Sequence, residues 1–182
     1  ASVPTSDRFT EEPFIVGSGE WALPGTLSLP VATGCSVAVV LVHGSGPNDR
    51  DETVGANKPF RDLAWGLAER GVAVLSYEKR TRQHGAKFAS LGDFTVREET
   101  VEDALLAVAG LRAHDRIDEN HIFVLGHSIG GTLAPRIAMG DEDIAGLVVM
   151  AGSTRPLPEL FLEQMEYLES VGSAPASTEG SL

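Results

Sequence analysis

Four short apolar runs constrain the fold of this chain more than any other feature of its sequence. They are rich in β-branched residues and occupy positions 36–43, 72–77, 121–125 and 144–150. Near-continuous apolar runs of this length are typical of parallel strands that are buried on both faces. We therefore expect these runs to form successive strands of one mostly parallel sheet.

Segments with helical periodicity separate the runs. Apolar residues recur with the spacing of one helix face at 60–68 and again at 101–108, where Thr95 and Glu98 form a capping box before the second segment. A third helix is expected at 128–139. Strands that alternate with helices predict an α/β fold, in which helices cover both faces of a mostly parallel sheet.

The two ends of the chain differ from this alternating core. Gly and Pro interrupt short apolar runs in EEPFIVGSGEWALPGTLSLP, a pattern that indicates an antiparallel hairpin at a sheet edge. We expect residues 1–156 to form the core and residues 157–182 to begin a lid or cap region, because 158–169 places its apolar residues on one helical face. The final GSAPASTEGSL is small and polar, which predicts a disordered tail.

The sequence GHSIGG at 126–131 lies between an expected strand and an expected helix. A serine on a sharp strand-to-helix turn has strained backbone angles, and only very small residues two positions away on either side leave room for it. Gly126 and Gly130 meet this requirement, and the helix N-terminus offers free N–H groups to a developing anion. The motif predicts a nucleophile elbow with Ser128 as the catalytic nucleophile, and a plain small-residue turn is the alternative.

A second motif, HGSGP at 43–47, follows the first expected strand of the parallel sheet. An oxyanion hole needs two converging backbone N–H groups, one from the residue after the nucleophile and one from the loop after an earlier strand. We expect the amides of Ile129 and Ser45 to form it, with Gly46 as the next candidate. Gly44 would let the main chain approach the substrate, and the ring of His43 would brace the loop from beneath. An ordinary Gly-Pro turn is the alternative.

These motifs, together with NDRDE, NKPF and YEKR, resemble those of bacterial α/β-hydrolases of the serine aminopeptidase-like and dienelactone hydrolase-like group. The resemblance covers about residues 14–156. Members of that group are mostly esterases, with thioesterases and peptidases among their relatives. The resemblance implies that Ser128 is the nucleophile and that the amides of Ser45 and Ile129 bind the oxyanion.

The resemblance also implies an acid after the seventh strand of the sheet and a histidine after the eighth. Neither strand is recognisable in this sequence, so we expect the acid and the base to lie in a C-terminal portion missing from this chain or on a separate polypeptide. None of the histidines at 43, 114, 121 and 127 is expected to replace the base. His127 should pack beside the elbow and point away from Ser128, which leaves His84 as the remaining candidate within the chain.

The charged residues of two loops are expected to be structural. The segment 49–52 carries three carboxylates, which are too few for a calcium site, and solvated or ion-paired roles are expected for them. Lys79, Arg80 and Arg82 are expected to pair with Asp49 or Asp51, and Glu78 to brace its loop. No phosphate loop, dinucleotide fingerprint or CxxC pattern occurs, so we expect no cofactor and no metal.

The composition limits the partners and the compartment. A net charge of -12 disfavours nucleic acid and anionic membranes as partners, because the field of the protein repels phosphate. A single cysteine excludes a disulfide within the chain, so a cytoplasmic location is expected. The alternative is a protein from which a signal peptide has been removed.

Together these features predict a serine hydrolase that cleaves a carboxylic ester of a small molecule through an acyl-enzyme intermediate. Amide or thioester cleavage by the same machinery is one alternative. A non-catalytic binding protein that retains the fold is the other.

Overall fold

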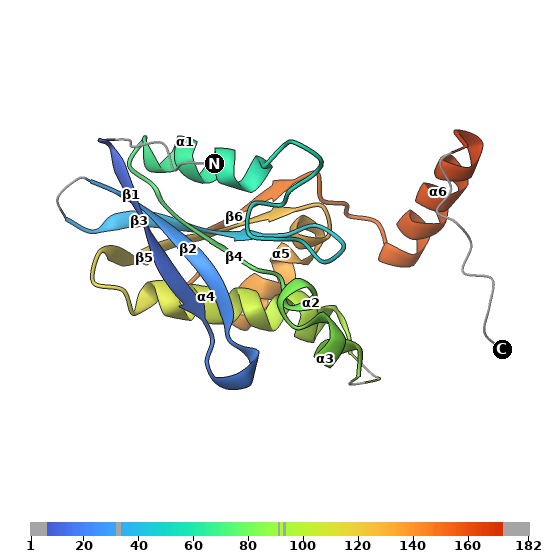
Figure 1. The fold of residues 1–182 in the computed structure, drawn as a ribbon, viewed down its shortest axis with the longest axis horizontal. Coiled ribbons are helices and arrows are strands. Elements are labelled where there is room, and N and C mark those ends of the chain that lie inside the picture. Colours follow the sequence, from blue (N-terminus) through green and yellow to red (C-terminus); the bar gives the residue numbers. More distant parts are fainter. Residues whose placement is uncertain (1–6, 32–33, 91, 93, 173–182) are drawn as a thin grey trace. The chain divides into compact units, whose positions relative to one another are not determined.

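The computed structural model describes residues 7–31, 34–90, 92 and 94–172, and it divides the chain into two compact units, Ala1–Gly152 and Ser153–Leu182 (Figure 1). The first unit contains a six-stranded sheet with the strand order β1-β2-β4-β3-β5-β6. Its strands are β1 Phe9–Val16, β2 Leu23–Pro30, β3 Ser36–Val42, β4 Ala73–Tyr77, β5 Ile117–His127 and β6 Gly146–Met150. The last four coincide with the four apolar runs, which confirms the expected α/β fold.

The strand directions also agree with the sequence-based expectation. β3 is parallel to both β4 and β5, and β5 is parallel to β6. β1 and β2 form the expected antiparallel hairpin, and β2 joins the sheet antiparallel to β4. Because β3, β4, β5 and β6 run the same way, their carboxyl ends share one edge of the sheet, which is where ligands bind in open α/β folds.

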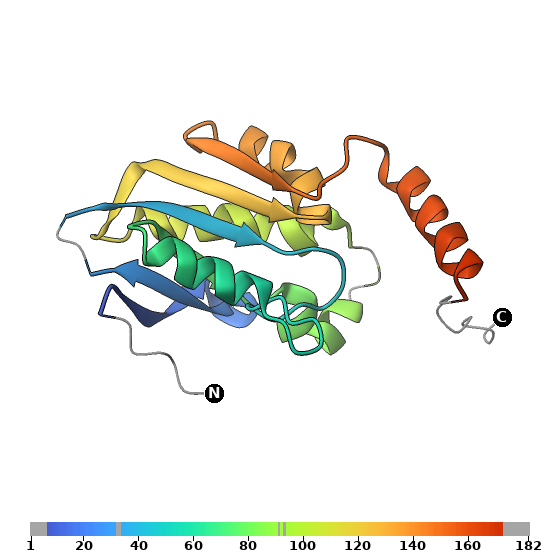
Figure 2. The ribbon, with the colours of Figure 1, turned by 90° about the horizontal axis from the view of Figure 1, so that it is seen from above.

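Helices cover both faces of the sheet (Figures 1 and 2). Among its described residues, the first unit contains five α-helices, a 3-10 turn η1 and a π-helical turn η2: η1 Gly19–Trp21, α1 Pro59–Ala68, α2 Arg80–Gln83, α3 Gly85–Ala89, η2 Arg97–Val101, α4 Glu102–Arg112 and α5 Ile129–Gly140. On one face, Phe60 and Ala64 of α1 pack against Leu41, Val74 and Leu125. On the other face, α4 and α5 supply Ala104, Ala107, Val108, Leu111 and Ile137. The burial of these apolar side chains is the main source of stability of the unit.

β6 departs from the expectation that all four runs are buried on both sides. Its side chains Leu147, Val148 and Val149 are 37%, 46% and 53% exposed. β6 lies at the end of the strand order and, within the described residues, pairs only with β5. The prediction of double burial is therefore wrong for β6, because the apolar run contains no information about whether a neighbour covers it.

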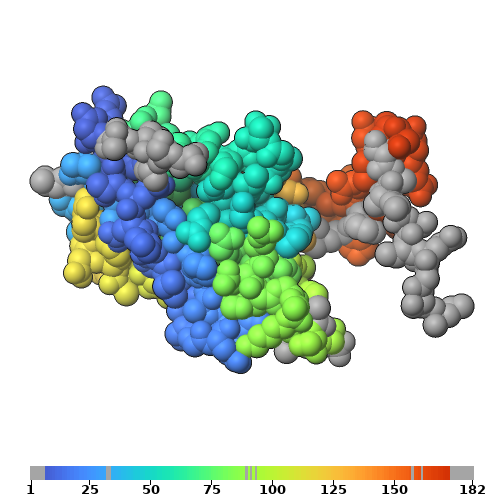
Figure 3. All heavy atoms as spheres, in the orientation of Figure 1, coloured from blue at the N-terminus to red at the C-terminus, as the bar shows by residue number. Residues whose placement is uncertain are grey.

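Helices α2 and α3 follow β4 and pack against the β1–β2 hairpin (Figure 3). The ring of Trp21 meets the rings of His84 and Phe88 edge to face, with centroids 5.4 and 6.3 Å apart. The ammonium group of Lys87 lies 4.2 Å from the centroid of the same indole ring. These contacts fix the loop after β4 to the first strands of the sheet.

The capping box before α4 is present as expected. The backbone N–H of Thr95 donates to the Glu98 carboxylate at 2.8 Å, and the Thr95 hydroxyl accepts from the N–H of Arg97 at 3.1 Å. The helix then begins with the π-helical turn η2, which directs Glu99 towards the loop after β4. A π-helical turn of this kind is uncommon and often occurs beside a functional site.

The second unit contains α6, Leu157–Ser170, where the lid helix was expected. Arg155 forms an ion pair with Glu163 of this helix. The expected disordered tail falls mainly at 173–182, outside the described residues. Among the residues that the structure describes, no helix has the length and apolar character needed to cross a membrane.

A buried ion pair connects α2 to α4. Arg80 forms a fork with both carboxylate oxygens of Asp103, and the two side chains are 11% and 1% exposed. We expect Asp103→Asn to lower the free energy of unfolding by about 3 kcal/mol, because it leaves a buried guanidinium without its counter-charge. The measurement is urea unfolding followed by circular dichroism.

Glu102→Gln is the matched control. Glu102 pairs with Arg97 on the surface of the same helix, so this change should cost less than about 1 kcal/mol. Equal losses for the two variants would contradict a special role for the buried pair.

Candidate active site

Ser128 occupies a sharp turn between β5 and α5. Its backbone angles are φ 52° and ψ -116°, a conformation that residues other than glycine seldom adopt. Its N–H donates to the carbonyl of Met150 on β6 at 2.9 Å, and its carbonyl accepts from the N–H of Thr132 at 2.9 Å. Its side chain does not cap the helix. The turn is therefore held on both sides by backbone hydrogen bonds, which leave the hydroxyl available for chemistry.

The neighbouring glycines are required by the close approach of main chain on either side of the turn. A Cβ added to Gly126 would lie 2.3 Å from the carbonyl carbon and oxygen of Gly130. A Cβ on Gly130 would lie 2.4 Å from the carbonyl oxygen of Val42 and 2.6 Å from that of His43. Real side chains do not tolerate such distances, so both positions need glycine. The first turn of α5 thus lies directly against the end of β3.

The loop after β3 runs beside Ser128. Gly44 is buried, and a Cβ added to it would lie 3.4 Å from the Cβ of Ser128. Ser45 and Gly46 follow it and are exposed, and Gly46 has φ +89°. The structure thus brings together the two motifs from which the sequence predicts an oxyanion hole. The catalytic roles of Ser45, Gly46 and Ile129 stay predictions.

Glu52 connects the two motifs and was not singled out by sequence. Its Oε1 accepts from the N–H of Gly44 at 2.6 Å and lies 3.0 Å from Nδ1 of His127. The residue is 3% exposed and has φ 50°, and Oε2 has no hydrogen-bond partner among the described residues. Of the solvated and ion-paired roles expected for the 49–52 cluster, the solvated role is wrong for Glu52, which is buried and pairs with His127. Its left-handed backbone turns the side chain inward, and no local sequence signal marks this conformation.

Lys79 reaches the same glycine from the loop after β4. Its Nζ donates to the carbonyl oxygen of Gly44 at 2.8 Å and lies 3.1 Å from the carboxylate of Glu99, and the side chain is 3% exposed. Asn48 donates to the same carbonyl oxygen at 3.1 Å. The backbone of the loop after β3 is therefore hydrogen-bonded on both sides of Gly44, through the N–H and through the carbonyl oxygen of this residue.

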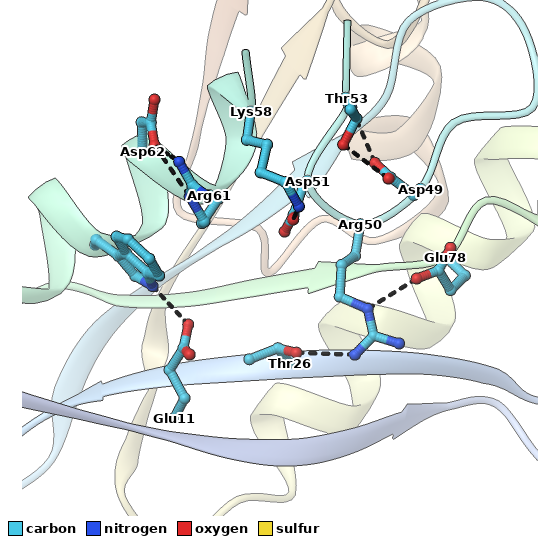
Figure 4. Close-up of polar contacts among 11 residues, drawn as sticks. Glu11, Thr26, Asp49, Arg50, Asp51, Thr53, Lys58, Arg61, Asp62 and Glu78 are labelled. Carbon is cyan, nitrogen blue, oxygen red and sulfur yellow. Dashed lines mark hydrogen bonds and ion pairs between the residues drawn. The ribbon is translucent and has the colours of Figure 1, made fainter. Parts of the chain in front are cut away.

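The other charges of the loop after β3 form their own pairs (Figure 4). Arg50 binds Glu78 at 2.8 Å, which agrees with the expected bracing role of Glu78, and Lys58 pairs with Asp51. Asp49 accepts from the backbone N–H and the hydroxyl of Thr53. The expected pairing of Lys79 and Arg80 with Asp49 or Asp51 is wrong, because these two basic residues pair with Glu99 and Asp103.

His43 directly follows β3 and is buried, and its role in bracing the loop stays a prediction. It packs between Phe60 and Tyr77, with ring centroids 5.1 and 5.4 Å away, and is 2% exposed. Burial lowers the pKa of His43 to about 3, and the nearby charge of Lys79 acts in the same direction. A ring that stays neutral over the physiological pH range adds no charge near the oxyanion loop.

The remaining histidines are bound to groups other than Ser128. His84 lies 3.0 Å from the carbonyl of Ala22, so its candidacy as the base finds no support in a contact. His114 pairs with Glu12 and His121 with Asp118. His127 faces Glu52. Among the described residues, no histidine is hydrogen-bonded to the Ser128 hydroxyl.

The described residues contain no group of three or more His, Cys, Asp or Glu side chains that could hold a metal ion. The strained turn at Ser128 lies beside the loop after β3, and acyl transfer at this place stays a prediction.

A family model described as the alpha/beta hydrolase family matches residues 39–179, and the chain therefore belongs to this family. Esterase EstD of Thermotoga maritima is 47% identical over 152 residues, which are 84% of this chain and 35% of that protein. The chain thus spans about a third of the length of this curated relative.

Solved structures share the fold at lower identity. A dienelactone hydrolase from Anabaena variabilis matches with a TM-score of 0.62 and 21% identity, over 88% of this chain and 69% of the other. A hypothetical protein from Pseudomonas aeruginosa, PA2218, matches with a TM-score of 0.63 and 16% identity, over 99% and 61% of the two chains. Brefeldin A esterase, a bacterial homologue of human hormone sensitive lipase, gives a TM-score of 0.60 and 18% identity, over 90% and 47%.

The steric requirement at Gly130 can be measured. We expect Gly130→Ala to lower the free energy of unfolding by about 2 kcal/mol or more, because the added Cβ meets two backbone carbonyl oxygens that cannot move independently. Gly66→Ala in α1 is the matched control: only the flexible end of Arg70 lies near its added Cβ, at 3.7 Å. That change should be neutral or stabilise by about 0.5–1 kcal/mol through helix propensity. A harmless Gly130→Ala would contradict the tight turn.

The lowered pKa of His43 predicts how stability depends on pH. Between pH 6.5 and about 3 the unfolded chain binds a proton at His43 that the folded chain excludes. The neutral ring of His43 therefore makes its full contribution to the free energy of unfolding above pH 6.5, and this contribution is lost as the pH falls. From pH 7 to pH 5 this group should remove about 2 kcal/mol of stability. In urea unfolding, the His43→Asn variant should not show this loss between pH 7 and pH 5. The control variant His121→Asn, at an exposed histidine, should still show it. An unchanged pH slope in His43→Asn would contradict the assignment.

Proposed function

We propose that this chain carries the nucleophile and the oxyanion-binding amides of an esterase that cleaves a carboxylic ester of a small molecule. The observation that supports the proposal most strongly is Ser128 itself, whose backbone has φ 52° on a glycine-cleared turn beside the loop at Gly44. A strained conformation of this kind costs of order 1–3 kcal/mol and persists where function requires it. The name of the Thermotoga relative, an esterase, points to the same reaction.

The proposed reaction proceeds through an acyl-enzyme. The Ser128 oxygen attacks the ester carbonyl carbon while its proton passes to a general base, and the carbonyl oxygen becomes an oxyanion held by the N–H groups of Ile129 and Ser45. The C–O bond to the alcohol then breaks, and the alcohol leaves with that proton. Water, deprotonated by the same base, attacks the acyl group and restores the free serine, with release of the carboxylic acid.

We propose that the base and its orienting acid are supplied by residues outside the 182 of this chain. Two observations support this: the chain covers 35% of the length of its esterase relative, and no described histidine is hydrogen-bonded to the Ser128 hydroxyl. A partner segment of the same protein would complete the site. The helix α6 would then belong to the lid that sets specificity.

The substrate is proposed to be a neutral or cationic ester, since the net charge of -12 disfavours polyanions such as nucleic acids. A cytoplasmic setting suits the free thiol of Cys35. Thioesters and amides are processed by the same machinery, so the ester is preferred only because of the relative's name.

A fluorophosphonate probe on the complete protein tests the proposal, because it reacts only with an activated serine. We expect covalent labelling of the tryptic peptide that contains Ser128, complete loss of labelling in Ser128→Ala, and unchanged labelling in Ser90→Ala, an exposed serine of the first unit. Peptide mass spectrometry locates the adduct. A complete protein that is folded but unlabelled at Ser128 would favour the binding-protein alternative.

A further inference from the structure

We propose that Lys79 is a positioning residue of the oxyanion hole: its ammonium group, bonded to the carbonyl oxygen of Gly44, orients and polarises the N–H of Ser45. This inference rests on the proposed function and adds to it a residue that touches neither substrate nor nucleophile. The observation behind it is a nearly fully buried Lys79 that donates to a loop carbonyl at 2.8 Å.

The geometry of the peptide unit makes the connection. The carbonyl of Gly44 and the N–H of Ser45 belong to one planar trans peptide, so they point in opposite directions. Lys79 and Asn48 both donate to that carbonyl oxygen, at 2.8 and 3.1 Å, and they thereby fix the plane of the peptide. The direction of the Ser45 N–H is set by the same two bonds.

A cation at the carbonyl end also strengthens the N–H as a donor. It draws electron density towards the carbonyl oxygen, which raises the partial positive charge on the amide hydrogen, as in a chain of cooperative hydrogen bonds. Lys79 is 3% exposed, so water screens this effect little. In a site of this kind the amide donor can bind a developing oxyanion without reorganisation.

The surrounding acids explain why a cation is needed at this position. Glu52 holds the N–H of Gly44 at 2.6 Å, which removes that N–H from the set of oxyanion donors and brings an acidic side chain close to the loop. Glu99, from the π-helical turn, lies 3.1 Å from Lys79 and fixes its ammonium group. Lys79 bonds the carbonyl oxygen of the glycine whose N–H is bonded to Glu52, and it places a positive charge at the peptide proposed to bind an anion.

A structural role in the Glu99 ion pair is the competing explanation. The two explanations predict different effects on the ratio of kcat/KM for two substrates. A purely structural change alters the amount of folded protein and leaves this ratio unchanged. An ester and its thionoester are suitable substrates for the comparison. Their tetrahedral intermediates place the negative charge on oxygen and on sulfur, and sulfur is the poorer acceptor for a backbone N–H.

The experiment compares Lys79→Met with the unchanged complete protein. We expect kcat for p-nitrophenyl acetate to fall by about tenfold or more with little change in KM, since one lost oxyanion donor costs about a hundredfold or more in other enzymes. The ratio of kcat/KM for the ester to that for its thionoester should fall as well. Lys58→Met is the matched control: Lys58 pairs with Asp51 in the same loop, does not contact Gly44, and its loss should leave the ratio unchanged.

Asn48→Ala provides a second test if Lys79→Met unfolds. It removes the neutral donor to the Gly44 carbonyl oxygen, together with its bond to the carbonyl oxygen of Ser45 at 3.0 Å, from a half-buried site. We expect a smaller fall in kcat and in the same ratio than in Lys79→Met. An unchanged ratio in folded Lys79→Met would overturn the inference, and if that variant does not fold, an unchanged ratio in Asn48→Ala would do so. In either case, labelling of Ser128 would leave the proposed function intact. Absence of labelling at Ser128 in the unchanged protein would overturn the proposed function, and this inference with it.

Discussion

The backbone turn at Ser128 is the constraint on which the rest of the site depends. A φ of 52° at a serine is unfavourable by itself, and the surrounding main chain maintains it through the bonds to Met150 and Thr132. Because Gly126 and Gly130 have no side chains, β5, α5 and the end of β3 approach within distances that a Cβ would forbid. The same close approach also brings Gly44 beside Ser128.

Around this turn, buried polar residues hold the main chain instead of facing the solvent. Glu52 binds Gly44 and His127, so a single carboxylate connects the loop after β3 with the turn at Ser128. Lys79 and Asn48 hold the other side of Gly44, and Glu99 links Lys79 to the π-helical turn before α4. Buried charges are costly unless each one is bonded, and here the bonds go to the main chain on both sides of Gly44.

The sequence predicts those parts of the structure whose physical requirements lie within a few consecutive residues. The apolar runs of β3 and β5 and the glycines around Ser128 follow from burial and steric demands that a few consecutive residues express. It failed for Glu52 and Lys79, because their contacts with Gly44 join residues 8 and 35 positions away through loop conformations that no pattern encodes. It also failed for the exposure of β6, because an apolar strand does not reveal which neighbour covers it.

A crystal structure of the complete protein after reaction with a fluorophosphonate would show whether Ser128 is the nucleophile. We predict a bond from the Ser128 oxygen to phosphorus, with the phosphonyl oxygen accepting from the N–H groups of Ile129 and Ser45 at about 2.7–3.1 Å. The carbonyl of Gly44 should keep its bond to Lys79 in that adduct. A phosphonyl oxygen that faces away from the loop after β3, or an adduct on another residue, would contradict this prediction.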